Sequence, residues 1–354
     1  MPGVIRVLIV DDSAFVRKVV AQMLSRSPFL EVVGTAHDGE EALEMVERLK
    51  PDVITLDLVM PRVDGLEFLR RQMAIRPIPV VVCSISHQSG AAALEALELG
   101  AVDFVQKPTA LATDRVFEIA DELIAKVKAA SAVFVGPRAS EAIPEHAVNS
   151  MVSAQPPESI ARGESRVDIV VIGISTGGPQ ALRQVIPRLP ATLPVPVAVV
   201  LHMPVGYTAM YAERLNEISN LEVHEATEGE AMVRGRMYLA PAGQHLTFTN
   251  ATDGTVRTHL DLRPLETAHR PSVDVLFRSA AETYGARVLG VVMTGMGNDG
   301  MVGAAHIQAK GGRVLTEDES SCVVYGMPRA VVEAGVGDRV ATLGDMAATI
   351  LEMI

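Results

Sequence analysis

The sequence is poor in features that would point to several classes of protein. It contains no tryptophan, and aromatic residues make up 4% of its 354 residues, so stacking platforms for single-stranded nucleic acid are not expected. Lysine and arginine number 31 against 43 acidic residues, and the net charge of −12 does not favour binding to phosphate backbones. No apolar run approaches the roughly 20 residues that a membrane-spanning helix needs.

Cysteine is also scarce. Cys83 and Cys322 lie far apart, and neither belongs to a Cys-x-x-Cys or Cys/His cluster, so the sequence supports neither a structural zinc site nor a redox motif. The N-terminus enters an apolar, strand-like segment directly, without the basic and apolar segments of a signal peptide. We therefore expect a reducing, cytosolic environment.

The length and the apolar pattern predict two domains joined by a linker. We expect a first domain over residues 1–130, a linker over 131–165 and a second domain over 166–354. The linker segment holds four prolines among scattered Ser, Ala and Glu residues and shows no sustained helix or strand period.

Short apolar segments alternate with helix-spaced segments through the first domain. The expected strands are Val4–Val10, Glu31–Ala36, Val53–Asp57, Val80–Ser84 and Val102–Lys107. Regular alternation of apolar strands with helices predicts a doubly wound, flavodoxin-like α/β domain whose parallel sheet is covered on both faces.

The second domain is predicted to hold a Rossmann-like, mostly parallel α/β sheet. Its expected strands are Val167–Ile174, Val195–His202, Arg287–Thr294 and Gly312–Thr316. Three further segments are predicted to form an antiparallel hairpin part, namely Met237–Ala240, Leu246–Thr249 and Arg257–Leu262.

Acidic and polar residues stand at the strand ends of the first domain. Asp11 and Asp12 follow the first strand, and Asp57 ends the third. Ser84 ends the fourth strand, and Lys107 follows the fifth. Because the carboxyl ends of parallel strands meet at one edge of a sheet, these side chains are expected to converge. Three carboxylates repel one another unless a hard cation such as Mg²⁺ lies among them, and a carboxylate can accept a phosphoryl group.

An alternative interpretation is that these acids merely cap helices. Asp12 precedes Ser13 at the expected start of a helix and fits such a role. Helix capping would explain neither Asp57 nor Lys107.

The pattern resembles the response-regulator receiver domain over the whole first domain. The resemblance implies Asp57 as the phosphorylated residue, Asp11, Asp12 and Asp57 as Mg²⁺ ligands, and Ser84, Phe104 and Lys107 as switch residues. Phenylalanine at position 104 is a mild departure, because tyrosine is common there. A phenyl ring can still swing in or out, but it lacks the hydroxyl contact.

The second domain begins with a glycine-rich turn. Residues 173–179 read Gly-Ile-Ser-Thr-Gly-Gly-Pro, directly after a predicted strand and before a helix. Gly-x-Ser-x-Gly at such a turn is typical of a nucleophile elbow, which leaves the Ser175 hydroxyl exposed. The following helix N-terminus offers N–H groups for an oxyanion. The same turn also fits a dinucleotide phosphate loop, so by itself it leaves both interpretations open.

A serine nucleophile needs a base and an acid. His202 ends the second strand of this domain, and Asp299 follows the Arg287–Thr294 strand, both at the edge that Ser175 occupies. Three strand ends that carry Ser, His and Asp predict a serine hydrolase. Taken singly, each also fits a structural role as a turn serine, a strand-end histidine or a helix cap. Cys322 has no local base and is a poor alternative nucleophile.

Six segments follow one another in the order GISTGGP, LHMP, APAGQHL, HRPSVDVLF, MTGMGNDG and YGMPRAV. From about Val167 to the C-terminus they resemble the catalytic domain of the chemotaxis protein-glutamate methylesterases. The resemblance implies Ser175 as nucleophile, His202 as general base and acid, and Asp299 as the orienting acid. It also implies the backbone N–H groups of Thr176 and Met296 as oxyanion donors.

The resemblance implies a phosphorylation-activated hydrolase that removes methyl esters from chemoreceptor glutamates, releases methanol and can also deamidate receptor glutamines. It implies no cofactor in the esterase site. The implied partners are the methylated cytoplasmic helices of chemoreceptors and the histidine kinase of the chemotaxis array as phosphodonor. We further expect a cytoplasmic monomer, recruited to receptor arrays, without nucleic-acid binding or membrane insertion.

Two other functional classes can be compared with this prediction. A DNA-binding response regulator would need a basic recognition helix in its second half, and the sequence offers none. A nucleotide-dependent reductase would need an acid about 20 residues beyond the glycine turn, at the end of the second strand, where His202 stands instead.

Overall fold

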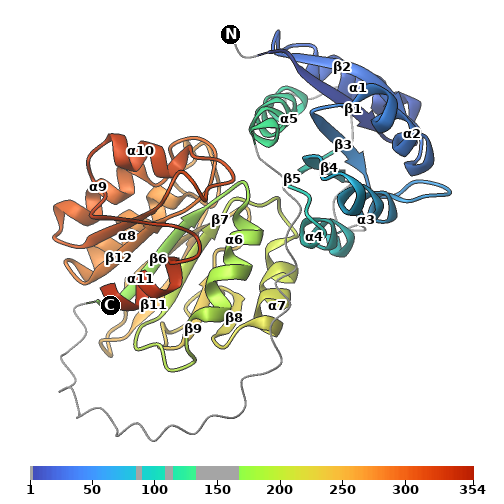
Figure 1. Cartoon of the computed structure of the whole chain (residues 1–354). Coiled ribbons are helices and arrows are strands. Elements are labelled where there is room, and N and C mark those ends of the chain that lie inside the picture. Colours follow the sequence, from blue (N-terminus) through green and yellow to red (C-terminus); the bar gives the residue numbers. More distant parts are fainter. Residues whose placement is uncertain (1–2, 85–89, 108–114, 133–166) are drawn as a thin grey trace, which may run out of the picture.

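The computed structural model describes residues 3–84, 90–107, 115–132 and 167–354. They form two parallel sheets, each covered by helices, and a separate antiparallel ribbon of two strands (Figure 1). Most of the segment predicted as a linker, residues 131–165, lies outside the described residues. No described helix is both long enough and apolar enough to span a membrane.

The first sheet has the strand order β2-β1-β3-β4-β5, with every neighbouring pair parallel. Helices α1 and α5 pack together on one face, and α2, α3 and α4 follow one another on the other face. The predicted doubly wound architecture is therefore confirmed. The elements are β1 (Ile5–Val10), α1 (Ala14–Leu24), β2 (Leu30–Ala36), α2 (Gly39–Leu49), β3 (Val53–Asp57), α3 (Gly65–Ile75), β4 (Val80–Ser84), α4 (Gly90–Glu98), β5 (Asp103–Gln106) and α5 (Arg115–Ser131).

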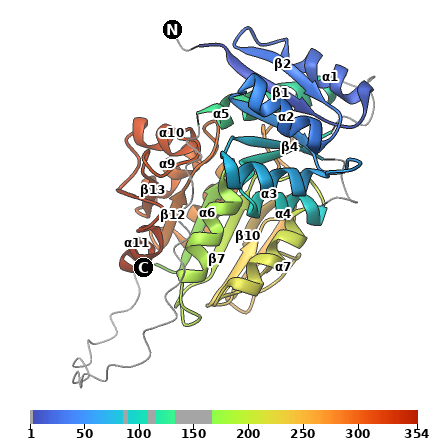
Figure 2. The ribbon, with the colours of Figure 1, turned by 45° about the vertical axis from the view of Figure 1, so that its right-hand side comes forward.

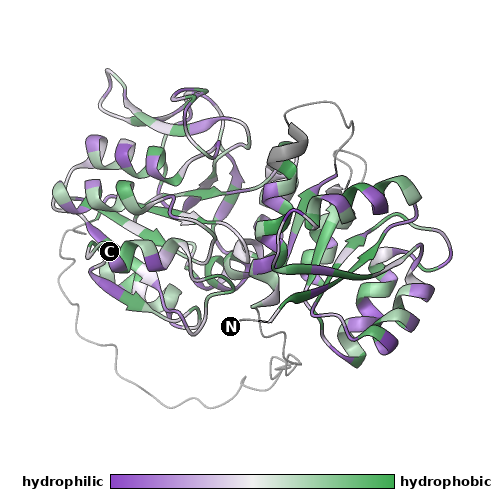
Figure 3. Ribbon diagram, turned by 90° about the horizontal axis from the view of Figure 1, so that it is seen from above, coloured by the Kyte–Doolittle hydropathy of each residue, from purple (hydrophilic) through white to green (hydrophobic). Residues whose placement is uncertain are grey.

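The second sheet has the order β14-β13-β12-β6-β7-β9-β8, and its pairs are also parallel. Its central strands are uninterrupted runs of buried, largely β-branched residues, as expected for strands with helices on both faces (Figure 3). The first elements are β6 (Ile169–Ile174), α6 (Gly178–Val185), η1 (Ile186–Arg188), β7 (Val197–Leu201), α7 (Thr208–Ile218), β8 (Glu222–Glu225) and β9 (Arg236–Leu239). They are followed by β10 (His245–Asn250), β11 (Val256–Asp261), α8 (Val273–Tyr284), β12 (Val288–Val292), α9 (Met301–Ala309), β13 (Arg313–Glu317), α10 (Met327–Glu333), β14 (Arg339–Ala341) and α11 (Met346–Met353).

One strand assignment from the sequence is wrong. The segment Met237–Ala240 was expected in the antiparallel part, but β9 pairs in parallel with β7 inside the main sheet. Only β10 and β11 form the antiparallel ribbon. The side chains of Met237, Tyr238 and Leu239 are fully buried, which suits an interior parallel strand better than a half-exposed hairpin strand.

The first sheet's α4–β5 side packs against α6, α7 and the loop before α7 (Figure 2). One hydrophobic cluster runs through both sides of this interface and includes Leu94 and Leu97 on one side and Tyr207 and Tyr211 on the other. Its polar margin centres on Glu98, which pairs with two arginines described below.

Candidate active site

The register of two central strands places Ser175 beside His202. In the parallel pair β6–β7, Ile174 lies opposite Leu201, so the next residue of each strand stands at the same edge. The backbone N–H of His202 donates to the carbonyl of Ile174 at 3.1 Å. Asp299 lies in the loop after β12, which pairs with β6 on its other side. The three predicted residues therefore stand beyond the carboxyl ends of three neighbouring strands, β12, β6 and β7, where the order of the strands in the sheet reverses.

His202 and Asp299 are in direct contact. The Nε2 atom of His202 lies 2.9 Å from Oδ2 of Asp299, and their side chains are 9% and 10% exposed. An ionised Asp299 accepts this hydrogen bond, so Nε2 carries the proton and Nδ1 keeps its lone pair. Nδ1 is buried and has no hydrogen-bond partner among the described residues. This nitrogen makes no hydrogen bond with Ser175 in the structure, and its acceptor position is free.

Asp299 is held by the start of α8. Its Oδ1 accepts from Ser272 Oγ at 2.9 Å and from the N–H of Asp274 at 2.9 Å, and its Oδ2 accepts from the N–H of Val273 at 2.8 Å. Burial by itself would raise the pKa of Asp299, but the bond and charge of His202 and the backbone N–H groups outweigh it and lower the pKa to about 2. Asp299 is thus an anion with a fixed orientation.

Helices α8 and α9 cap each other. Asp299, which precedes α9, accepts from the first turn of α8, whereas Asp274 in that turn accepts from the backbone of α9. Oδ1 of Asp274 receives the N–H groups of Gly300 at 2.9 Å and Gly303 at 2.6 Å. Each carboxylate therefore satisfies free N–H groups at the positive end of the other helix.

The turn after β6 has the geometry of a nucleophile elbow. Gly177 has a φ of +80°, and a Cβ there would overlap Val323, so this position requires glycine. The N–H of Ser175 donates to the carbonyl of Thr294 at 3.0 Å, and α6 starts at Gly178. Among the described residues, the backbone N–H groups of Thr176 and Met296 donate to no protein acceptor. They remain available for an oxyanion.

The sequence analysis assigned no role to His269, but its ring stacks on that of His202. The centroids are 4.1 Å apart, and the ring planes are inclined by 24°. Desolvation, together with the nearby His202, lowers the pKa of His269 to about 4, so its ring is neutral near pH 7. Its position in the HRPSVDVLF segment was the one available indication of a role.

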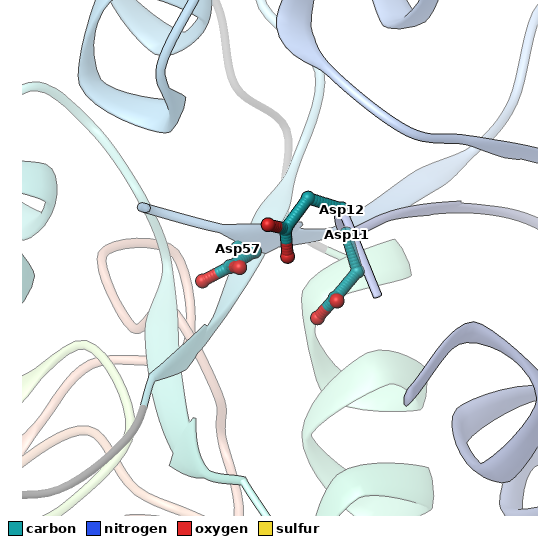
Figure 4. A group of neighbouring side chains, drawn as sticks. All are labelled: Asp11, Asp12 and Asp57. Carbon is teal, nitrogen blue, oxygen red and sulfur yellow. The ribbon is translucent and has the colours of Figure 1, made fainter. Parts of the chain in front are cut away.

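Figure 4 shows the second candidate site, where Asp11, Asp12 and Asp57 gather at the edge of the first sheet. One carboxylate oxygen of each lies within 4.8 Å of the others. The ammonium group of Lys107 contacts Oδ2 of Asp11 at 2.6 Å and Oδ2 of Asp57 at 2.7 Å. Two carboxylates thus contact one ammonium group and a third lies beside them, so the remaining negative charge and the oxygen ligands fit a metal ion.

Burial disfavours the charged forms of the side chains at this site. It raises the pKa of Asp57, although Lys107 offsets part of the effect. Burial alone would lower the pKa of Lys107, but its bonds to Asp11 and Asp57 outweigh it and raise that pKa. The lysine is therefore charged near pH 7.

The two remaining predicted switch residues differ in what can be said of them. Ser84 ends β4, but its side chain lies outside the described part of the structure. Phe104 in β5 is buried in the interface, with its ring centroid 4.8 Å from that of Tyr207. Tyr207 follows His202 by five residues, so the first sheet contacts the loop that leaves the candidate base.

We predict that Asp299→Asn lowers the free energy of unfolding at pH 7 by about 2 kcal/mol, because a pKa below the usual value stabilises the folded state above pH 4. This difference should shrink as the pH falls from about 4 towards 2, where the folded wild-type carboxyl also takes up a proton. Urea unfolding across this pH range measures it. Asp253→Asn, in an exposed turn, is the control and should change stability far less. A constant difference between pH 7 and pH 2 would contradict the assignment.

Two family models match this chain. Residues 170–350 match the model described as CheB methylesterase, and residues 7–116 match the response regulator receiver domain. A relative from Myxococcus xanthus, named protein-glutamate methylesterase/protein-glutamine glutaminase 5, is 51% identical over 97% of this chain and 96% of its own length. A relative of the same activity name from Bacillus subtilis is 41% identical over 99% of this chain and 98% of its own.

A solved structure agrees with the second sheet. The CheB methylesterase catalytic domain of Thermotoga maritima is 42% identical, with a TM-score of 0.52, and matches 53% of this chain and 99% of that one. The sequence relationship extends over nearly the whole chain, including both sheets and both candidate sites. The chain therefore belongs to the CheB methylesterase family, in its form with an N-terminal response regulator receiver domain.

Proposed function

We propose that this protein is a phosphorylation-activated protein-glutamate methylesterase that hydrolyses methyl esters on glutamate side chains of chemoreceptors. The observation that carries the proposal is the meeting of Ser175, His202 and Asp299 at one edge of the second sheet, with the receiver packed against the loop after His202. The names of relatives over nearly the full length supply the substrate class.

The reaction follows from the arrangement of these side chains. Oγ of Ser175 attacks the ester carbonyl while Nδ1 of His202 takes the hydroxyl proton. Asp299 stabilises the resulting imidazolium, and the N–H groups of Thr176 and Met296 face the oxyanion. His202 returns the proton to the methoxide, which leaves as methanol. Water, activated by the same histidine, then splits the acyl-enzyme to glutamate and free Ser175.

The same chemistry acts on glutamine. If the leaving group is ammonia instead of methanol, the acyl-enzyme is identical and its hydrolysis again yields glutamate. The relatives carry both activities in their names, and we propose that receptor glutamines are a second substrate.

We predict that Ser175→Ala lowers methanol release by about 10⁴-fold or more without unfolding the protein, because it removes the attacking oxygen. The assay uses membranes with methylated chemoreceptors, a small phosphodonor and Mg²⁺. Ser219→Ala, at the end of α7, is the matched control and should keep wild-type activity. Near-normal turnover by folded Ser175→Ala would refute the nucleophile.

Regulation is proposed to begin at Asp57. Asp11, Asp12 and Asp57 would hold Mg²⁺, which when bound offsets the charge of the incoming phosphoryl group. Phosphorylation of Asp57 puts roughly −1.5 to −2 charges beside Lys107 in place of the single charge of the carboxylate, a net gain of about one negative charge or less. We propose that this change moves Ser84 and Phe104 and weakens the contact of Phe104 with Tyr207.

The interface offers several contacts that phosphorylation can weaken. Arg183 and Arg214 donate to the same Oε1 atom of Glu98, at 2.8 and 3.1 Å. Gln180 donates to the carbonyl of Ala101. A shift from 1:99 to 99:1 in favour of the open form requires about 5.5 kcal/mol. One phosphoryl group supplies only part of this, so graded activation is expected.

We predict that Glu98→Arg raises methanol release without phosphodonor by about threefold to tenfold, because it replaces two half-buried ion pairs with repulsion. Activity with phosphodonor should change less. Glu44→Arg on α2, away from this interface, makes the same charge change and should leave the basal rate unaltered (Figure 1). A basal rate of Glu98→Arg at or below that of Glu44→Arg would contradict the proposal that the docked receiver lowers activity.

The partners follow from this function. We propose the methylated cytoplasmic helices of chemoreceptors as substrates, the histidine kinase of the array as phosphodonor, and a cytoplasmic monomer recruited to receptor arrays. The proposed domain division is residues 1–130, 131–165 and 166–354.

A further inference from the structure

Glu317 is a buried carboxyl group that the proposed reaction does not use. It ends β13, and the residue is fully buried, with 0% of its surface exposed. In the parallel pair β12–β13, Val292 lies opposite Thr316. Glu317 therefore stands beside the first residues of the loop that leads from β12 to Met296 and Asp299.

Both oxygens of this carboxyl group accept hydrogen bonds from loops next to the candidate nucleophile. Oε2 accepts from the backbone N–H of Thr294 at 2.8 Å, and Oε1 accepts from Ser321 Oγ at 3.0 Å. The bond to Thr294 is buried, so without Glu317 this N–H group would lie in the interior without its present acceptor.

Thr294, held by Glu317, in turn contacts the nucleophile elbow. Its carbonyl accepts from the N–H of Ser175 at 3.0 Å, and its Oγ1 donates to the carbonyl of Thr176 at 2.9 Å. The next residue, Gly295, packs so closely on Ser175 that a Cβ would lie 2.8 Å from the serine Cβ. Met296, with its proposed oxyanion N–H group, follows directly. One peptide unit therefore touches the nucleophile and leads into the oxyanion loop.

We propose that Glu317 is a positioning residue, which holds the Thr294 peptide and thereby sets the places of the Ser175 hydroxyl and the two oxyanion N–H groups. The proposal rests on the proposed function in one respect, the assignment of Ser175 as nucleophile. Glu317 touches neither substrate nor reacting atoms, so its loss should slow acylation and leave ligand affinity nearly unchanged. Small displacements of reacting groups are costly, since a misplacement of about 1 Å can reduce a rate about 10²-fold.

Glutamine should replace Glu317 well. Burial raises the pKa of Glu317, and the bonds from Thr294 and Ser321 offset part of this. The site therefore needs an acceptor oxygen aimed at the Thr294 N–H group more than it needs a full negative charge. A glutamine carbonyl supplies that oxygen, and its amide group can pair with the Ser321 hydroxyl.

The test is the rate at which a fluorophosphonate modifies Ser175 in the full chain, with the maximal rate and the half-saturating concentration measured separately. Glu317→Leu should lower the maximal rate about 10- to 100-fold with little change in half-saturation. Glu317→Gln should stay within about threefold of wild type. Thr316→Val, a fully buried change at the preceding position of β13, is the matched control and should react normally.

Two further variants keep the test decisive if Glu317→Leu does not fold. Ser321→Ala removes one hydrogen bond to Glu317 and should slow modification about two- to fivefold. Ser320 donates to Asp318 and not to Glu317, so Ser320→Ala should not slow modification. The positioning role is overturned if folded Glu317→Leu reacts like Thr316→Val, if Glu317→Gln falls as far as Glu317→Leu, or if Ser321→Ala matches Ser320→Ala. The probe needs no receptor and is used with phosphodonor and Mg²⁺, which release the docked receiver, so a wild-type chain that then leaves Ser175 unmodified refutes the nucleophile itself.

Discussion

The Asp299 carboxylate is the contact on which the catalytic half of this protein depends. It receives four donors, from His202, from Ser272 and from the first backbone N–H groups of α8. Val273, one of those backbone donors, packs so closely on Gly173 and Gly300 that neither glycine has room for a Cβ. The acid that contacts His202, the proposed base, thus also fixes α8 against the end of β6. Its electrostatic role and its structural role cannot be separated, because the same oxygen atoms carry both.

The two candidate sites follow from one constraint of parallel sheets. Strands that run in the same direction bring their carboxyl ends to one edge, so residues far apart in the chain meet there without any local motif. In the receiver this edge gathers Asp11, Asp12 and Asp57, and Lys107 contacts the first and the last of them. In the second sheet it gathers the serine, the histidine and the acid. Phe104 and Tyr207 connect the two halves, since each ring lies in the interface and belongs to a strand or loop that leads to one site.

Much of this arrangement could be predicted from the sequence, because strongly apolar strands and glycine turns are local features. The strands β6 and β7 are continuous apolar runs that Ser175 and His202 directly follow, and the mainly apolar strand β3 ends in Asp57. The assignment of Met237–Ala240 to a hairpin failed because pattern alone does not choose a strand's partner. That choice depends on which neighbouring strand allows the side chains of Met237 and Tyr238, on opposite faces of β9, both to be buried. The contact of His269 with His202 was missed for a similar reason, since it joins residues 67 positions apart.

By itself, the sequence determined the elements, the alternation that makes both sheets parallel, and the residue types at the strand ends, because these depend on local propensity, burial pattern and turn chemistry. Only the tertiary structure decided that Nε2 of His202 faces Asp299, that Phe104 rests on Tyr207, and that Glu317 lies behind the elbow. These contacts depend on how side chains from different elements fill a shared space. A single buried hydrogen bond or ring contact of that kind produces no repeating pattern in the sequence.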